Sequence, residues 1–177
     1  MLQKNECERL KSYCDNSVKK IQSVCNNDRQ RAPQFLYAHF LLAHSPYCFN
    51  STGELRNPEK VFLDSNIVRG YLEEISYANK IIKELVTYIQ ENNRKNSVII
   101  IAGDHGFRSH SDDNMDKHIF RIRFAASNLN GRIQNWPDTI SGVNIFRLVL
   151  NTYLGAEMPL LPHRSFFLRS KQPSGKQ

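Results

Sequence analysis

Apolar residues recur at every third or fourth position in two long stretches of the chain, residues 5–25 and 67–92. This spacing puts the apolar side chains on one face of an α-helix. The pattern therefore predicts two amphipathic helices, of which the first is expected to cover the face of a sheet. Its apolar positions are Leu10, Cys14, Val18, Ile21 and Val24 or Cys25; those of the second are Val68, Tyr71, Leu72, Ile75, Ala78, Ile82, Leu85, Val86 and Ile89.

Two shorter runs, 35–42 and 97–102, are apolar at almost every position. An uninterrupted run of this kind is typical of a strand that is buried on both faces, as in a parallel sheet. Because the helix at 67–92 lies between them, the order strand, helix, strand predicts a right-handed crossover unit with two parallel strands.

The last third of the chain predicts one more strand and one more helix. Residues 118–126 alternate between apolar and polar positions, with two arginines on the polar face, which indicates a half-exposed strand. Residues 142–153 have helical spacing, and Gly155 is suited to end that helix. Together these elements predict an α/β fold.

Size and charge narrow the class of protein. A chain of 177 residues fits one domain with a real core. The net charge of +7 (24 basic minus 17 acidic residues) is scattered, without a basic block interleaved with aromatics, so we expect no nucleic-acid binding. The excess is compatible with an anionic substrate. No apolar run reaches the ~18 residues of a membrane helix, and residues 1–31 lack the apolar centre of a secretory signal.

The four cysteines, at positions 7, 14, 25 and 48, show no zinc-finger spacing. Cys7 and Cys14 are expected on one helix, where seven residues correspond to about 10 Å of rise, too far for a disulfide. The cysteines alone leave the redox compartment open.

The strand at 97–102 runs into Gly103-Asp104-His105-Gly106. Ligands gather at the carboxyl ends of parallel strands, and carboxylate and imidazole are both metal ligands. Asp-X-Gly is also common in plain turns. The strand at 35–42 likewise ends close to a histidine, His44, which we expect near Asp104 and His105. His39 lies inside that strand, where a histidine is more often part of the core.

Three landmarks now stand in order: His39 to His44-Ser-Pro-Tyr47, a long helix, and Ile101-Ala-Gly-Asp-His-Gly106. In this order and spacing the chain resembles the alkaline phosphatase and sulfatase superfamily, and more closely the sulfatase-like domains of bacterial membrane-associated hydrolases and transferases. The segment from Asn144 to Pro162 resembles the closing segment of such domains, so the likeness runs from about Gln34 to Phe167.

The resemblance implies a three-layer α/β/α sandwich, alkaline phosphatase-like, of which this chain holds the C-terminal part. The expected organisation is an N-terminal helix and linker at 1–33, the sulfatase-like part at 34–168 and a basic tail at 169–177. The same resemblance implies a complete protein that is membrane-anchored with this domain outside the cytoplasm, through an N-terminal region that this sequence does not contain.

The resemblance also assigns roles to single residues. Asp104 and His105 match a pair of metal ligands. His44 matches a histidine that contacts the phosphate or sulfate group of the substrate or completes a second metal position, and His39 matches a histidine found in some branches only. His110 or His118 could supply a further histidine. An imidazole ligand favours zinc or manganese over calcium, and Asp-His in place of Asp-Asn favours phosphoryl transfer.

The nucleophile and the first acidic metal ligand of the family have no counterpart in the sequence, and the motif Cys or Ser, X, Pro, X, Arg does not occur. We therefore assign no catalytic residue. The expected function is the C-terminal part of a metal-dependent hydrolase or transferase for phosphate or sulfate esters, inactive as this chain. The alternative is a catalytically silent α/β domain that serves in binding or assembly.

Overall fold

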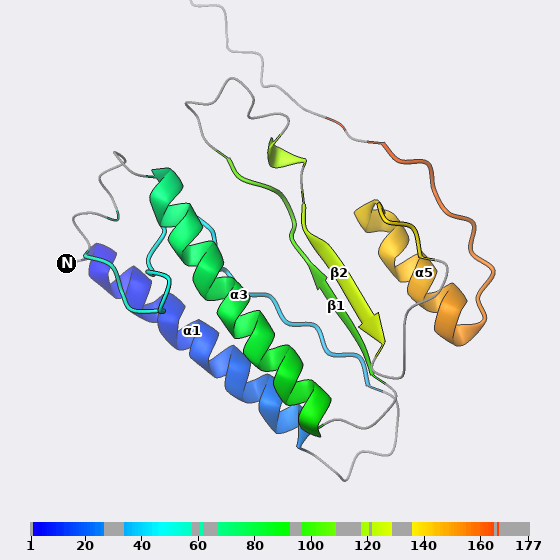
Figure 1. Ribbon diagram of the computed structural model, residues 1–177, viewed down its shortest axis with the longest axis horizontal. Coiled ribbons are helices and arrows are strands. Elements are labelled where there is room, and N and C mark those ends of the chain that lie inside the picture. The colour runs from blue at the N-terminus through cyan, green and yellow to red at the C-terminus, as the bar shows by residue number, and fades with distance from the viewer. Residues whose placement is uncertain are drawn as a thin grey trace, which may run out of the picture. The chain divides into compact units, whose positions relative to one another are not determined.

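The computed structural model describes residues 2–26, 34–57, 61, 67–92, 97–108, 118–120, 122–128, 136–164 and 166. Its elements are helix α1 (Leu2–Cys25), helix α3 (Ile67–Asn92), strand β1 (Val98–Ala102), strand β2 (Phe124–Asn128) and helix α5 (Gly142–Leu154) (Figure 1). The chain divides into two compact units, residues 1–97 and 98–177.

The first unit is built on the two long helices, and both were predicted from the apolar spacing. α1 packs against α3 (Figure 1), and the expectation that this helix covers a sheet face stays a prediction. An amphipathic stripe specifies that a helix is covered on one side and does not specify by what. The core contains Cys7 and Ile21 of α1, Tyr77, Ile81 and Leu85 of α3, and Cys48 and Phe49 of the segment between the helices.

The predicted strand at 35–42 is absent. Residues 34–42 have no strand structure, and the side chains of Phe35 and Tyr37 are 75% and 74% exposed. Apolar composition indicates a tendency to be buried, whereas a strand also needs a neighbour to complete its hydrogen-bond ladder. The predicted parallel pair of 35–42 with 97–102, and with it the crossover unit, is therefore wrong.

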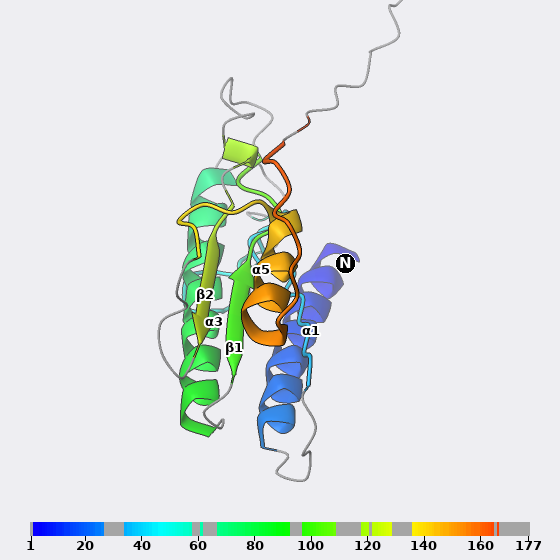
Figure 2. The same cartoon turned by 90° about the vertical axis from the view of Figure 1, so that its right-hand side faces the viewer.

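In the second unit, β1 is paired with β2 (Figures 1 and 2). The pairing is antiparallel and runs from Val98 opposite Asn128 to Ala102 opposite Phe124. The strand at 97–102 is confirmed in place, but its parallel partner and its burial on both faces are not: β1 is partly exposed along its length. The second predicted strand begins later than expected, because residues 118 and 119 form a helical turn.

α5 confirms the predicted last helix and its end. Gly155 has φ 65°, in the left-handed region that favours glycine, and its amide donates to the carbonyl of Leu150. Two asparagines of α5 hold the chain that follows. The amide group of Asn144 exchanges two hydrogen bonds of 2.9 Å with the backbone of Leu161, and Asn151 does the same with Met158 at 2.8 and 2.9 Å.

The described residues thus contain helices and a two-stranded sheet, which agrees with an α/β protein. The three-layer sandwich stays a prediction. None of the helices in the described part of the chain combines the length and the apolar content that crossing a bilayer requires.

Candidate functional site

The loop that carries Asp104 and His105 begins directly after β1. Its ends are held by two backbone hydrogen bonds: the amide of Gly103 donates to the carbonyl of Arg123 at 2.9 Å, and the amide of Gly106 donates to the carbonyl of Ile119 at 2.7 Å. The loop is therefore fixed to the chain that leads into β2. This places the aspartate and the histidine at the end of the strand, as the sequence predicted.

The two side chains of this pair face each other. Oδ1 of Asp104 accepts the backbone N–H of His105 at 2.9 Å, and Oδ2 lies 3.6 Å from Nε2 of His105. The other ring nitrogen, Nδ1, lies 2.7 Å from the carbonyl oxygen of Gly106. Because a carbonyl oxygen only accepts, Nδ1 carries the proton, and a neutral ring has its lone pair on Nε2. Two electron-donating atoms of adjacent residues thus lie 3.6 Å apart.

This geometry fits a divalent metal at two positions of its coordination shell. Two ligand atoms of a tetrahedral zinc ion, each about 2.0–2.1 Å from the metal, lie about 3.3 Å apart, slightly closer than the 3.6 Å between Oδ2 and Nε2. A ligating histidine also commonly donates its second N–H to a backbone carbonyl, as His105 does. The aspartate is 81% exposed, so its carboxylate is accessible to a metal ion from solvent.

Within the described ranges no group of three or more His, Cys, Asp or Glu residues is suited to hold a metal ion. His110, one of the two candidates for a further histidine, lies outside the described residues. His118 is described and exposed.

His44 lies in the first unit, on the segment between α1 and α3, and its side chain is exposed. Its Nδ1 is 2.6 Å from the carbonyl oxygen of Ser45, so Nδ1 is the protonated nitrogen, as in His105. Nε2 then accepts or ligates when the ring is neutral and donates to an anion when the ring is charged. Because His44 and the Asp104–His105 pair belong to different units, their common site stays a prediction.

His39 is not the core residue that a histidine in a buried strand would be. Its side chain is exposed, and its ring centroid lies 6.5 Å from that of Tyr37. Its backbone carbonyl accepts a hydrogen bond of 2.8 Å from the hydroxyl of Tyr13, which fixes this part of the segment to α1.

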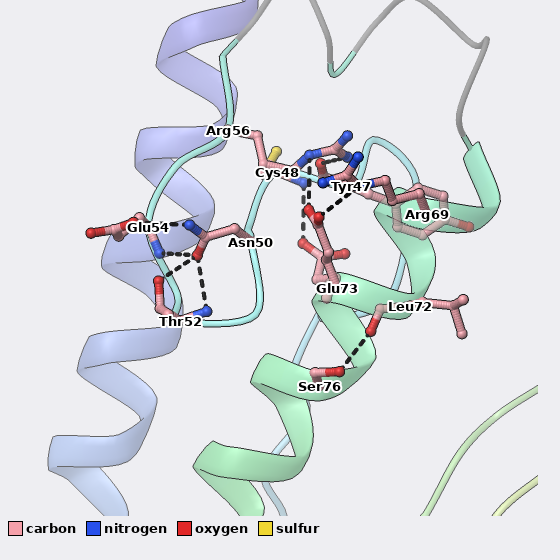
Figure 3. A network of polar contacts seen from close by, with 11 residues as sticks. Tyr47, Cys48, Asn50, Thr52, Glu54, Arg56, Arg69, Leu72, Glu73 and Ser76 are labelled. Atoms are coloured by element: carbon pink, nitrogen blue, oxygen red, sulfur yellow. Dashed lines mark hydrogen bonds and ion pairs between the residues drawn. The ribbon is translucent and has the colours of Figure 1, made fainter.

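Three features beside His44 were missed by reasoning from the sequence. Cys48 forms a disulfide with Cys7, which joins the segment to α1. The backbone N–H of Cys48 donates at 3.1 Å to Oε1 of Glu74, a carboxyl group of α3 that is fully buried. The guanidinium of Arg56 donates to the carbonyl of Tyr47 at 3.1 Å (Figure 3).

The signal for Glu74 was present in the apolar pattern of α3. The face that α3 buries consists of Gly70, Glu74, Tyr77, Ile81 and Leu85, so a carboxylate stands at helical spacing in the middle of the buried face. Of the apolar positions chosen from the sequence, only Leu85 belongs to this buried face, and two others, Val68 and Leu72, are 53% and 56% exposed.

Burial has a large effect on the Glu74 carboxyl. Loss of water raises its pKa to about 8, although the backbone amides of Cys48, Phe49 and Ala43 and the charge of Arg56 act in the opposite direction. Its second oxygen, Oε2, has no hydrogen-bond partner among the described residues. At neutral pH this side chain is therefore mainly protonated.

A family model described as Sulfatase matches residues 3–141. Neither the curated proteins nor the solved structures gave a match. Sulfatases have an alkaline phosphatase-like α/β fold, act in general on sulfate esters and generally use a divalent metal. The matched range contains His39, His44, Asp104 and His105 and covers most of the chain. The chain therefore belongs to the sulfatase family.

Proposed function

We propose that Asp104 and His105 supply two ligands to a divalent metal, zinc or manganese in preference to calcium, in a site for phosphate or sulfate esters. The observation that carries this proposal is the 3.6 Å separation of Oδ2 and Nε2, with Nδ1 of the histidine occupied by the carbonyl of Gly106. An imidazole nitrogen suits zinc and manganese, whereas calcium takes oxygen ligands.

His44 is the residue that we propose to contact the anionic group of the substrate. Its ring is exposed and oriented by the carbonyl of Ser45. When the ring is charged, Nε2–H is a donor for a phosphate or sulfate oxygen. His39, also exposed, is the second candidate for this contact.

In this proposal the chain holds the metal and orients the ester. A bound divalent metal would polarise the ester and stabilise the charge on its oxygens. Asp104 and His105 hold that metal, and Nε2–H of the charged His44 ring donates a hydrogen bond to an oxygen of the transferred group. We assign no nucleophile among the residues of this chain. Asp-His in place of Asp-Asn favours phosphate over sulfate esters.

The test is a calorimetric titration with zinc of the wild type, His105→Ala and the matched control His163→Ala. His163 is an exposed histidine that follows α5. Loss of the hydrogen-bond partner of a metal-ligating residue costs about tenfold to a hundredfold in metal affinity, so loss of the ligand itself should cost at least tenfold. His163→Ala should bind zinc as the wild type does. Equal losses in both variants would mean that zinc binds to surface histidines in general, which would overturn the proposed site.

A further inference from the structure

We propose that Glu74 is a positioning residue: its buried carboxyl group holds the backbone of the His44 loop at Cys48 and so sets where the imidazole is presented. The inference rests on the proposed function in one respect, since it takes His44 to be the group that contacts the substrate anion. The fixing of the backbone itself is independent of that role.

The hydrogen bond of Glu74 lies near the C-terminal end of the His44 loop, residues 43–49. The N–H of Cys48 donates to its Oε1 at 3.1 Å. The backbone amides of Phe49, after the loop's bend, and of Ala43, directly before His44, also act on this carboxyl group and favour its charged form. One side chain of α3 thus acts on three amides of a segment that has no strand or helix of its own.

The backbone beside His44 needs such support. Ala43 has φ 59°, in the left-handed region that a residue with a Cβ adopts only at a cost. Conformations of this kind persist where the surroundings determine them, and they are concentrated at functional sites. The strained residue here is the one that immediately precedes the exposed imidazole.

Glu73, the residue of α3 before Glu74, acts through Arg56 on a carbonyl group of the same loop. The guanidinium of Arg56 donates to the carbonyl of Tyr47 at 3.1 Å and lies 3.5 Å from the carboxylate of Glu73, which also accepts from Arg69 at 3.0 Å (Figure 3). A Cβ at Gly70 would clash with Nη1 of Arg56, so the glycine leaves room for this arrangement. Glu73 therefore holds a carbonyl of the loop through Arg56, and Glu74 holds the amide of Cys48 directly.

The segment after the loop, residues 50–54, is fixed by hydrogen bonds within its own turn. The side chain of Asn50 accepts from the backbone N–H groups of Thr52 and Glu54 at 3.0 and 2.9 Å and donates to the carboxylate of Glu54 at 2.9 Å (Figure 3). The ring of Phe49 lies 5.3 Å from that of Tyr77. With this turn and the buried ring in place, removal of the Glu74 contacts should loosen the His44 loop without unfolding the unit.

The experiment compares Glu74→Leu, which keeps much of the volume and loses the acceptor, with Glu74→Gln, which keeps an acceptor oxygen and resembles the protonated carboxyl. Glu84→Leu, at an exposed position of the same helix, is the matched control. Selective ¹⁵N labelling of the four cysteines reports the amide of Cys48 and, as internal references for the fold, the amides of α1. Labelled histidine reports the His44 ring, with inorganic phosphate as the probe.

We expect Glu74→Leu to speed hydrogen exchange of the Cys48 amide about tenfold, the effect of one lost hydrogen bond, while the amides of Cys14 and Cys25 stay protected. The resonances of the His44 ring should move, and the phosphate-induced shift should decrease severalfold. Glu74→Gln and Glu84→Leu should behave as the wild type. If Glu74→Leu leaves both Cys48 and His44 unchanged, the proposal is wrong.

Two further outcomes are separable. If phosphate does not affect His44 in the wild type, the proposed substrate contact fails, and the exchange of Cys48 together with the His44 resonances without phosphate still decides the positioning role. If Glu74→Leu does not fold, all cysteine amides exchange rapidly. Glu74→Asp, which withdraws the carboxyl by one methylene group, then replaces it, with the same expected changes in smaller size and the same contradicting result.

Discussion

The two units differ in the contacts that fix their candidate residues. The His44 segment is joined to α1 by a disulfide, to α3 by a buried carboxyl and an arginine, and to the core by Phe49. Asp104 and His105 stand on a loop that two backbone hydrogen bonds connect to the chain before β2. A two-stranded ribbon is by itself only marginally stable.

The distribution of buried side chains explains this difference. Of the described apolar residues that are buried, the second unit contributes only Ile145 and Leu148, both of α5. The first unit contributes the rest, from both helices and the segment between them. We infer that substitutions of Cys7, Cys48 or Glu74, which hold the His44 segment, change the free energy of unfolding. Substitutions of Asp104 or His105 should change metal binding and leave the free energy of unfolding almost unaltered.

At neutral pH the largest effect should come from the disulfide. It joins residues 41 positions apart, and closure of a loop of that length stabilises a folded chain by about 4 kcal/mol through the entropy of the unfolded state. The double variant Cys7→Ser/Cys48→Ser should lower the unfolding free energy of the first unit by that order, measured by urea denaturation. Cys25→Ser, which alters a half-buried free thiol, is the control. A loss below about 1 kcal/mol in the double variant would show that the disulfide does not stabilise the first unit appreciably.

The next effect is a pH dependence from Glu74. Its pKa is raised from 4.5 to about 8 in the folded chain by burial. Between those values the unfolded chain has released the proton and the folded chain has kept it, so stability is full below about pH 4.5 and falls as the pH rises toward 8. The slope should approach about 1.4 kcal/mol per pH unit.

Two groups near Glu74 bear on this slope. Arg56 favours the ionised form and reduces it, and the Cys14 thiol, whose pKa burial raises to about 11, stays neutral throughout. Glu74→Gln should remove this contribution, as measured by denaturation at several pH values. A variant with an unchanged pH profile would show that Glu74 is ionised in the folded chain.

In the second unit the strongest single contribution should come from Asn144, which is buried and bonded twice to the backbone of Leu161. Asn144→Ala leaves both backbone groups without their partner and should cost roughly 1–3 kcal/mol. Thermal unfolding followed by the fluorescence of Trp136, whose indole N–H donates to Thr152 of α5 at 3.1 Å, reports this unit. An Asn144→Ala variant as stable as the wild type would mean that the chain after α5 is held by other contacts.

The smallest effect should be that of Asp104→Ala on stability. The side chain is 81% exposed, and substitutions at such positions usually change the unfolding free energy by about 0.5 kcal/mol or less. A loss of more than about 1 kcal/mol of unfolding free energy in the absence of metal would contradict this contrast. It would mean that Asp104 stabilises the fold, as the residues that hold the His44 segment do.

The sequence predicted the helices well because their signal is local. Apolar spacing predicts α1, α3 and α5, and Gly155 marks the end of α5. The run at 35–42 is equally apolar, but a strand depends on a partner elsewhere in the chain, and no local pattern supplies it. The antiparallel pairing of β1 with β2 was missed for the same reason.

The candidate site divides along the same line. Asp104 and His105 are adjacent, so the motif itself brings them together. The contacts that hold the His44 segment join residues that are distant in sequence: 41 positions separate Cys7 from Cys48, and 26 separate Cys48 from Glu74. One local sign was present: Glu74 is a carboxyl group at helical spacing on the buried face of α3. It was missed because the apolar face predicted from the sequence differs slightly from the face that is buried.

The central claim is that Nε2 of His105 and a carboxylate oxygen of Asp104 bind a divalent metal while Nδ1 of the histidine stays protonated on the carbonyl of Gly106. The most direct measurement is a ¹⁵N spectrum of the histidine rings during a titration with zinc at about pH 8, where a histidine ring is ordinarily neutral. The account predicts that the Nε2 resonance of His105 shifts, that its Nδ1 keeps its proton, and that Asp104→Asn weakens the response. A shift of Nδ1 in its place, or a response of His163 with none from His105, would contradict the account.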